Sequence, residues 1–508
     1  MTARTHYIAL MSTTPETIRV IGAKAEELLR LHDHALEETI DAIRAKLAEG
    51  KKPEGAKWPK VSTRDNGMPS ISEAPIFERN GALKFSSVLE PSWNDEEARA
   101  KGKFPEDLFP RMHELVRFVL DDPEVSRCYM EKFHPDFTTV LVTMGVEQAA
   151  NTFMLRHGDV ASDAKTRSSV LRPLMNGLTG AWLKTPVVIP IALVRFDFDR
   201  IRLSKNAMLI RMSDGLHRAR WEGKAYAANG HDAVLASATH ALVLTDWGVA
   251  NHAKLSLGEI LSAPSNDIAT VVDSFFAALR LRLDIDTGYA QEIRLARGWR
   301  SHDRLGDPEV YAVGARRYPP HFDNYGWMNQ DLPIVSKDDM KAVAQTWAGL
   351  LAIDDSRFAL ALRRFNTAST RDDTADVILD ATIALEILLG DKDSQSISWK
   401  LRMRAAALIG LDANRSRMEE VRTAINDTYG VRSAIVHGGK RKSKDLDEHA
   451  AAKRAVDVLR TVINGTIAHP VYLDPLKIDA DLLLTSRVTG PAEGGDEKED
   501  APGAGSKV

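Results

Sequence analysis

The sequence of 508 residues contains a single cysteine, Cys128, and this scarcity excludes several kinds of structure. One thiol cannot form an intrachain disulfide or build a cysteine-rich zinc site. We therefore expect a protein of a reducing compartment, the cytoplasm. A chain of this length is also too long for one ordinary core, so we expect two to four domains.

Long apolar runs are missing as well. The most apolar run, PVVIPIALV at residues 186–194, is far shorter than the roughly 20 residues that a membrane-spanning helix requires. The first residues, MTARTHYIALMSTTPET, lack the long apolar core of a signal peptide. We therefore expect no membrane partner.

Neither sign of charge dominates the chain. Lysine and arginine number 67 against 71 aspartates and glutamates, which gives a formal net charge of −4. A chain so close to neutral has no global field that would attract nucleic acid. Any nucleic-acid site must therefore be a local basic patch.

The common motifs of nucleotide and hydrolase sites are also missing. The sequence has no G-x-x-x-x-G-K-[ST] loop, no G-x-S-x-G elbow and no Rossmann glycine fingerprint. The stretch HDH at residues 32–34 is followed by Glu37 and Glu38, but its two histidines would point about 200° apart on a helix. We expect a solvated helix face there rather than a metal site, and we expect no cofactor.

The apolar pattern changes along the chain and predicts a multidomain α+β fold. Residues 1–185 are mixed and largely helical, with an opening helix and mostly irregular structure from Lys51 to about Pro105. The text from 186 to 332 is rich in β-branched and aromatic residues and predicts an α+β domain with strands. Residues 333–475 are helical throughout and predict a bundle. Residues 476–508 lack apolar periodicity, which predicts a disordered tail.

One segment of that bundle, YGVRSAIVHGGKRKSK at residues 429–444, combines groups suited to phosphodiester chemistry. Arg432 can hold a phosphate, and His437 can move a proton near neutral pH. Because the two are five residues apart, they would lie about 140° apart on an ideal helix. They converge only if the helix bends or ends between them, or if two copies meet across a symmetric interface.

Four cations follow the histidine and suit contacts to an RNA backbone. They are Lys440, Arg441, Lys442 and Lys444. The set predicts a metal-independent site whose RNA substrate supplies its own 2′-hydroxyl nucleophile. A structural interpretation stays open, in which Arg432 pairs with a carboxylate, His437 caps helix carbonyls and the basic run is a solvated loop.

Three ordered blocks in this bundle resemble the Apea-like branch of the HEPN family. A helix with a Leu-Glu core comes first, a helix with an Arg-Ala pair follows, and a helix ending in Y-x-x-R-S-x-x-V-H-G comes third. The blocks are Leu385 to Leu388, Arg404 to Ala406, and Tyr429 to Gly438. The resemblance covers residues 338–470, about a quarter of the chain, and the first 330 residues show nothing comparable.

The resemblance implies an activity. Many HEPN proteins are metal-independent endoribonucleases of toxin–antitoxin or anti-phage systems, and they commonly act as dimers. It assigns Arg432 and His437 as the catalytic pair and Ser433 as the polar neighbour of the arginine. It also implies a homodimer through the bundle, with an N-terminal region that senses, restrains or positions the nuclease and can meet a protein trigger or inhibitor. Other HEPN domains have lost cleavage, so a non-catalytic module for RNA binding or dimerisation stays open.

Two further side chains belong to the predicted site as supporting residues. Glu386 stands among apolar residues in TIALEILLG, where an unpaired carboxylate is unfavourable, so it should bind Arg432 or Arg404. Such an ion pair would fix helix register, orient Arg432 near the phosphate, or do both. Tyr429 is expected to be a core aromatic whose hydroxyl reaches the cleft.

Overall fold

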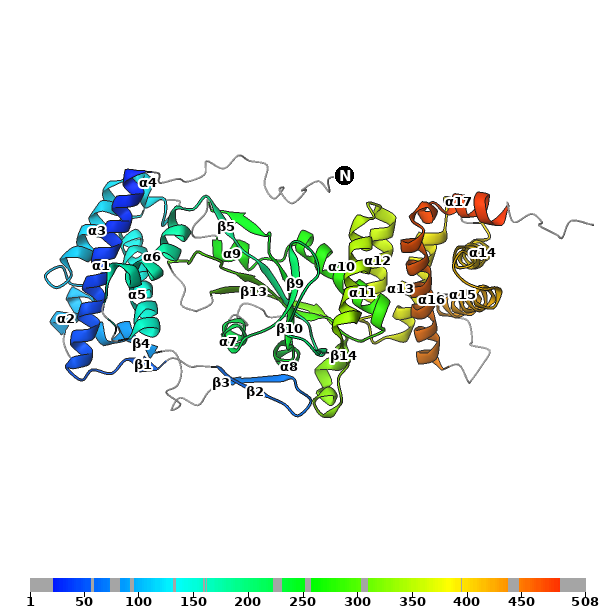
Figure 1. Cartoon of the computed structure of the whole chain (residues 1–508), viewed down its shortest axis with the longest axis horizontal. Helices are drawn as coiled ribbons and strands as arrows, with labels where there is room; N and C mark the ends of the chain where they lie inside the picture. Colours follow the sequence, from blue (N-terminus) through cyan, green and yellow to red (C-terminus); the bar gives the residue numbers. More distant parts are fainter. Residues whose placement is uncertain are drawn as a thin grey trace, which may run out of the picture. The chain divides into compact units, whose positions relative to one another are not determined.

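The computed structural model describes residues 22–55, 59–73, 83–91, 96–130, 134–158, 160, 162–222, 231–251, 257–302, 309–393, 395–436 and 447–484 (Figure 1). Contacts divide the chain into two compact units. The first comprises Met1–Ala352 with Ser369–Asp372, and the second comprises Ile353–Ala368 with Asp373–Val508. None of the described helices is long and apolar enough to cross a bilayer.

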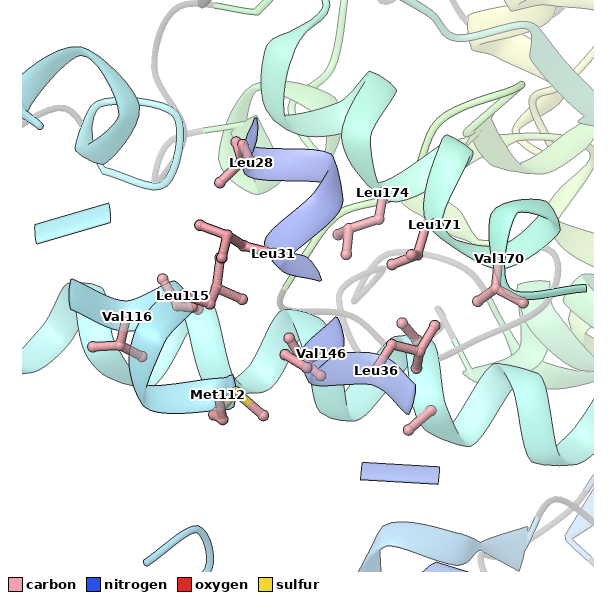
Figure 2. Close-up of a cluster of buried hydrophobic side chains, with 14 of the residues drawn as sticks. Leu28, Leu31, Leu36, Met112, Leu115, Val116, Val146, Val170, Leu171 and Leu174 are labelled. Atoms are coloured by element: carbon pink, nitrogen blue, oxygen red, sulfur yellow. The ribbon is translucent and has the colours of Figure 1, made fainter. Parts of the chain in front are cut away.

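The first unit begins with a cluster of helices around one apolar core. Leu28, Leu31 and Leu36 of the first helix meet side chains from three later helices in Figure 2. Burial of these leucines away from water stabilises the cluster and explains the helical spacing of apolar residues in this part of the sequence. The helices are α1 Ala23–Ala48, α3 Pro110–Asp121, α4 Pro123–Ser126, α5 Pro135–His157 and α6 Ala164–Thr179.

The HDH segment lies in α1, and the expectation of a solvated face is wrong for His32. Its side chain is fully buried, with Nδ1–H donating to Leu28 O at 2.8 Å and Nε2 accepting from the Tyr129 hydroxyl at 2.7 Å. Burial lowers the pKa of His32 to about 4, so the ring is neutral at physiological pH. The buried partner, Tyr129, lies 97 residues away in the sequence.

The acidic residues of the same segment form a structural network. Arg167 of α6 donates to both carboxylate oxygens of Asp33 at 2.8 Å and to Glu37 at 3.0 Å. This bidentate pair joins α1 to α6. No group of three or more histidine, cysteine or acidic side chains among the described residues could hold a metal ion.

The region after α1 contains more regular structure than the sequence predicts. The strands are β1 Glu54–Gly55, β2 Pro59–Thr63, β3 Pro69–Glu73 and β4 Leu83–Lys84, followed by the 3-10 helix η1 Phe85–Leu89 and by α2 Glu96–Lys101. β2 and β3 form an antiparallel hairpin. Its turn carries Asn66-Gly67, a dipeptide that favours tight hairpins.

A six-stranded antiparallel sheet follows and confirms a fold of mixed α and β structure. The strand order is β13-β12-β6-β10-β9-β8. Val188, Ala241, Val243 and Ile293 form one apolar cluster with side chains of α7 Asp214–Glu222, so this helix covers one face. The strands are β6 Val187–Pro190, β8 Arg200–Arg202, β9 Ala207–Arg211, β10 His240–Leu244, β12 Tyr289–Leu295 and β13 Val310–Arg317.

Smaller elements complete the first unit. β5 Trp182–Lys184 pairs with β11 Gly248–Ala250, and β7 Arg195–Phe196 pairs in parallel with β14 Ile334–Val335. The short helices are α8 Asp232–Ala236, α9 Leu257–Leu261, η3 Pro320–Asn324 and η4 Gly326–Asn329.

The boundary between the units differs from the predicted start of the bundle at residue 333. Helix α11, Lys337–Ala352, packs on α10, Asn266–Leu283, within the first unit. Trp347 of α11 donates from Nε1 to the Ser274 hydroxyl at 2.9 Å, and its ring meets Phe275 edge-on at 5.4 Å. The apolar stripe of α11 is therefore satisfied by α10, and the division falls after Ala352.

The described residues of the second unit are helical. Leu385 and Leu388 of α13 and Leu459 and Ile463 of α16 are buried. Asp373 and Asp447 cap the N-termini of these two helices by accepting backbone N–H groups. The α-helices are α12 Ser356–Ala368, α13 Thr374–Leu389, α14 Ile397–Ile409, α15 Arg415–Val436, α16 Glu448–Ala468 and α17 Pro475–Ile478.

The predicted tail begins too early. Residues 470–473 form the 3-10 helix η5, α17 follows, and a π-helical turn, η6, spans Asp479–Leu483. Asp479 is held there because its carboxylate binds the buried guanidinium of Arg404 on α14. The remaining residues of the predicted tail, 485–508, lie outside the described part of the chain.

Candidate active site

The end of α15 carries Arg432, whose guanidinium faces the carboxylate of Glu386 on α13. Nη2 and Oε1 are 3.8 Å apart, and the two side chains are 26% and 28% exposed. The separation is within ion-pair range but longer than a hydrogen bond. Because solvent screens a partly exposed pair, it contributes at most about 1 kcal/mol to stability. The guanidinium of Arg432 is therefore oriented by Glu386 while its donors stay accessible to a ligand.

The ring of Tyr429 supports the same guanidinium from one helical turn away. Cζ of Arg432 lies 5.5 Å from the centroid of the Tyr429 ring, which is a cation–π contact. Tyr429 is half-buried, as expected for a side chain that is partly core and partly surface. Together, Glu386 and Tyr429 hold Arg432 on two sides, which satisfies the expectation of a cationic partner for Glu386.

Ser433 is half-buried on α15, directly after Arg432 in the sequence. Neighbouring helical residues point about 100° apart, so Ser433 faces a different side of the helix from Arg432. Within the described ranges, no hydrogen bond joins its hydroxyl to Arg432 or Glu386. The structure thus brings Arg432, Glu386 and Tyr429 together and leaves Ser433 beside them.

The remaining residues of the predicted site lie outside the described residues. The structure describes α15 up to Val436, and the next described residue is Asp447, which caps α16. The undescribed residues of the site are His437, Lys440, Arg441, Lys442 and Lys444. The predicted convergence of Arg432 and His437 therefore stays a prediction.

Arg404, the other cation considered for Glu386, has a different role. Its side chain is 2% exposed and donates to Asp391 and Asp479, and to Leu389 O at 2.7 Å. Hydrogen bonds from Lys400, and then from Arg404, lower the pKa of Asp391 to about 2. Arg404 therefore joins α14 to the end of α13 and to η6, which fixes the scaffold around the Arg432 helix.

An exposed tryptophan near this helix was missed from the sequence. The α14–α15 hairpin is antiparallel, because Arg402 donates to Asn426 at 3.0 Å and a Cβ at Gly410 would contact Met418. Trp399 lies one turn from Arg402, at the level of Tyr429, and is 52% exposed. Trp399 stands between Ser398 and Lys400 in the sequence, where no local signal distinguishes an exposed ring from a buried one.

Comparison of the chain with protein-family models, curated proteins and solved structures finds no match. Function is therefore inferred from the residues of the second unit themselves.

Proposed function

We propose that the second unit is a HEPN-type helical bundle that cleaves RNA without a metal, as a toxin or anti-phage defence effector. The observation that carries the proposal is the accessible guanidinium of Arg432, held by Glu386 at 3.8 Å and by the Tyr429 ring, five residues before His437. A purely structural arginine would be expected to be sealed or fully paired. The resemblance of the three sequence blocks supports the same function.

In the proposed reaction, the substrate 2′-hydroxyl attacks the adjacent phosphorus. His437 takes or gives the proton of the 2′-hydroxyl or of the leaving 5′-oxygen. Arg432 stabilises the negative charge that builds on the phosphate oxygens, and Glu386 orients the guanidinium. The P–O5′ bond breaks as the P–O2′ bond forms, which leaves a 2′,3′-cyclic phosphate and a 5′-hydroxyl. Lys440, Arg441, Lys442 and Lys444 would contact the RNA backbone.

RNA cleavage is expected to survive removal of metal ions. Neither proton transfer nor charge stabilisation by Arg432 requires a Lewis acid in this mechanism. The test incubates the purified full-length protein with total RNA in excess chelator. Cleavage that disappears in chelator and returns with magnesium or manganese would overturn the mechanism.

The protein is expected to form a homodimer through the second unit, with α15 of each chain near the two-fold axis. Arg432 and His437 would be about 140° apart on an unbent helix, and two-fold symmetry can bring the groups of two chains together. Val436, at the end of the described helix, is 50% exposed and Ile435 is half-buried, which suits a contact between copies.

Mass measurement at micromolar concentration tests this assembly. Val436→Asp should give a monomer, whereas Leu411→Asp, at a 39% exposed position of the same unit, should stay dimeric. A wild-type protein that is strictly monomeric and still cleaves RNA would rule out the symmetric cleft.

The first unit is proposed to sense, restrain or position this nuclease, and to be the surface for a protein trigger or inhibitor.

A further inference from the structure

The turn of the β2–β3 hairpin is anchored firmly in the first unit. The Arg64 N–H donates to Met68 O at 2.8 Å, and the Gly67 N–H donates to Arg64 O at 2.9 Å. Asn66, which is 8% exposed, donates from Nδ2 to Trp327 O at 3.0 Å and to Met328 O at 3.2 Å. These bonds tie the turn to η4, so the side chains around it have a defined position.

Arg64, the first residue of this turn, is a half-buried cation. Its Cζ lies 5.8 Å from the centroid of the Trp327 ring, and Trp327 itself is buried. The Nε of Arg64 is shielded from solvent and has no hydrogen-bond partner. A buried donor without an acceptor is unfavourable, and no described residue supplies one to this nitrogen.

A second arginine reaches the same turn from β7. The backbone N–H of Arg195 donates to Pro333 O at 2.9 Å, which fixes the start of its side chain. Its Nε lies 2.8 Å, and its Cζ 3.0 Å, from the place where a Cβ on Gly67 would stand. Gly67 has φ +81°, so glycine is needed both for the backbone conformation and for this close approach.

No described residue neutralises either guanidinium. Arg64 and Arg195 form no ion pair and no side-chain hydrogen bond in the part of the chain that the structure describes, and both are half-buried. Asp65, in the same turn, is exposed and pairs with neither of them. Two arginines that lie at one turn and pair with no described carboxylate have donors free for an anion, which would supply the missing partner.

We propose that Arg64 and Arg195 form a binding site for a phosphate group, beside the hairpin turn of the first unit. Guanidinium groups bind phosphate through paired N–H donors, and no described residue pairs with the guanidinium of Arg64 or of Arg195. The site is independent of the proposed nuclease activity. It gives the first unit a ligand class to which it could respond, either free phosphate or the phosphate of a nucleotide.

Thermal unfolding and calorimetric titration of the full-length protein test this site, with inorganic phosphate and adenosine monophosphate as separate probes. We expect phosphate to raise the Tm of the wild type, and Arg64→Met and Arg195→Met each to weaken phosphate binding by about tenfold or more. Equal affinity for both probes would indicate free phosphate, and tighter binding of the nucleotide would indicate a nucleotide ligand. Arg202→Met, at an exposed position of β8, is the matched control and should bind like the wild type.

The variants also separate ligand binding from a structural role. Without phosphate, replacement of a partly exposed arginine that pairs with no described residue should leave the Tm nearly unchanged. Arg195→Lys keeps the charge but loses the paired donors, and should fold while binding phosphate more weakly. Absence of a phosphate effect in the wild type, or an equal effect in the wild type and both methionine variants, would overturn the proposal.

Discussion

Replacement of Arg432 or of His437 by alanine is expected to lower the rate of RNA cleavage by a factor of about 10² to 10⁴. The histidine variant would lose the proposed proton-transfer group, and the arginine variant would lose the cation proposed to face the phosphate. Both variants are expected to stay folded. For Arg432→Ala the reason is that the Arg432–Glu386 pair is partly exposed and contributes little to stability. Growth toxicity, if the wild type shows it, should disappear with cleavage.

Single-turnover cleavage rates of purified variants test this expectation. Arg422→Ala is the matched control, because Arg422 lies on the same helix and forms an exposed ion pair with Glu419 at 2.8 Å. This control should cleave like the wild type. Wild-type rates in both the Arg432 and the His437 variants would show that the site assignment is wrong.

The largest effect on stability is expected from Arg404→Ala. The guanidinium of Arg404 is 2% exposed and binds two carboxylates and one backbone carbonyl. Its removal leaves Asp391 and Asp479 without this partner, and breaking a buried pair in this way typically costs about 3–5 kcal/mol. Because Asp479 anchors η6 and α14 carries Arg404, the loss should loosen the end of the second unit.

Amide hydrogen exchange, resolved by segment, measures this loss in the second unit separately from the first. Protection should fall in α14 and around η6, while Arg417→Ala, an exposed arginine paired with Glu420 at 2.9 Å, should change little. Unchanged protection in Arg404→Ala would contradict the assigned role.

The pH dependence of stability has a definite sign, because the folded pKa of Asp391 is lowered to about 2. The stabilising contribution of the Asp391 carboxylate should be complete above its ordinary pKa of about 4 and be lost as pH falls towards 2.

Local sequence patterns predicted where helices form better than they predicted which elements those helices pack against. The stripe in α11 identified the helix, but the same apolar residues fit a bundle or the side of α10 equally well. The hydrogen bond from Trp347 to Ser274 places α11 against α10. Because these residues are 73 positions apart in the sequence, no local pattern predicts their contact. The predicted start of the tail at residue 476 was wrong for the same reason, since Asp479 is held by Arg404, 75 residues earlier.

Burial of polar residues was the least predictable property. His32 has polar and charged neighbours that suggest a solvated face, yet the Tyr129 hydroxyl and the Leu28 carbonyl satisfy both ring nitrogens. The sequence predicted that Glu386 forms an ion pair, because a carboxylate among apolar residues needs a cation. Which arginine supplies it depends on the packing of α13 against α15, and the sequence left Arg432 and Arg404 as equal choices.

The ends of the RNA products test the central claim most directly. The full-length protein is incubated with a defined oligoribonucleotide in excess chelator, and the termini of the fragments are identified by mass. Attack by the 2′-hydroxyl predicts a 2′,3′-cyclic phosphate on one fragment and a 5′-hydroxyl on the other, with none formed by Arg432→Ala or His437→Ala. Fragments that carry a 3′-hydroxyl and a 5′-phosphate, or an oligonucleotide left intact by the wild-type protein, would contradict it.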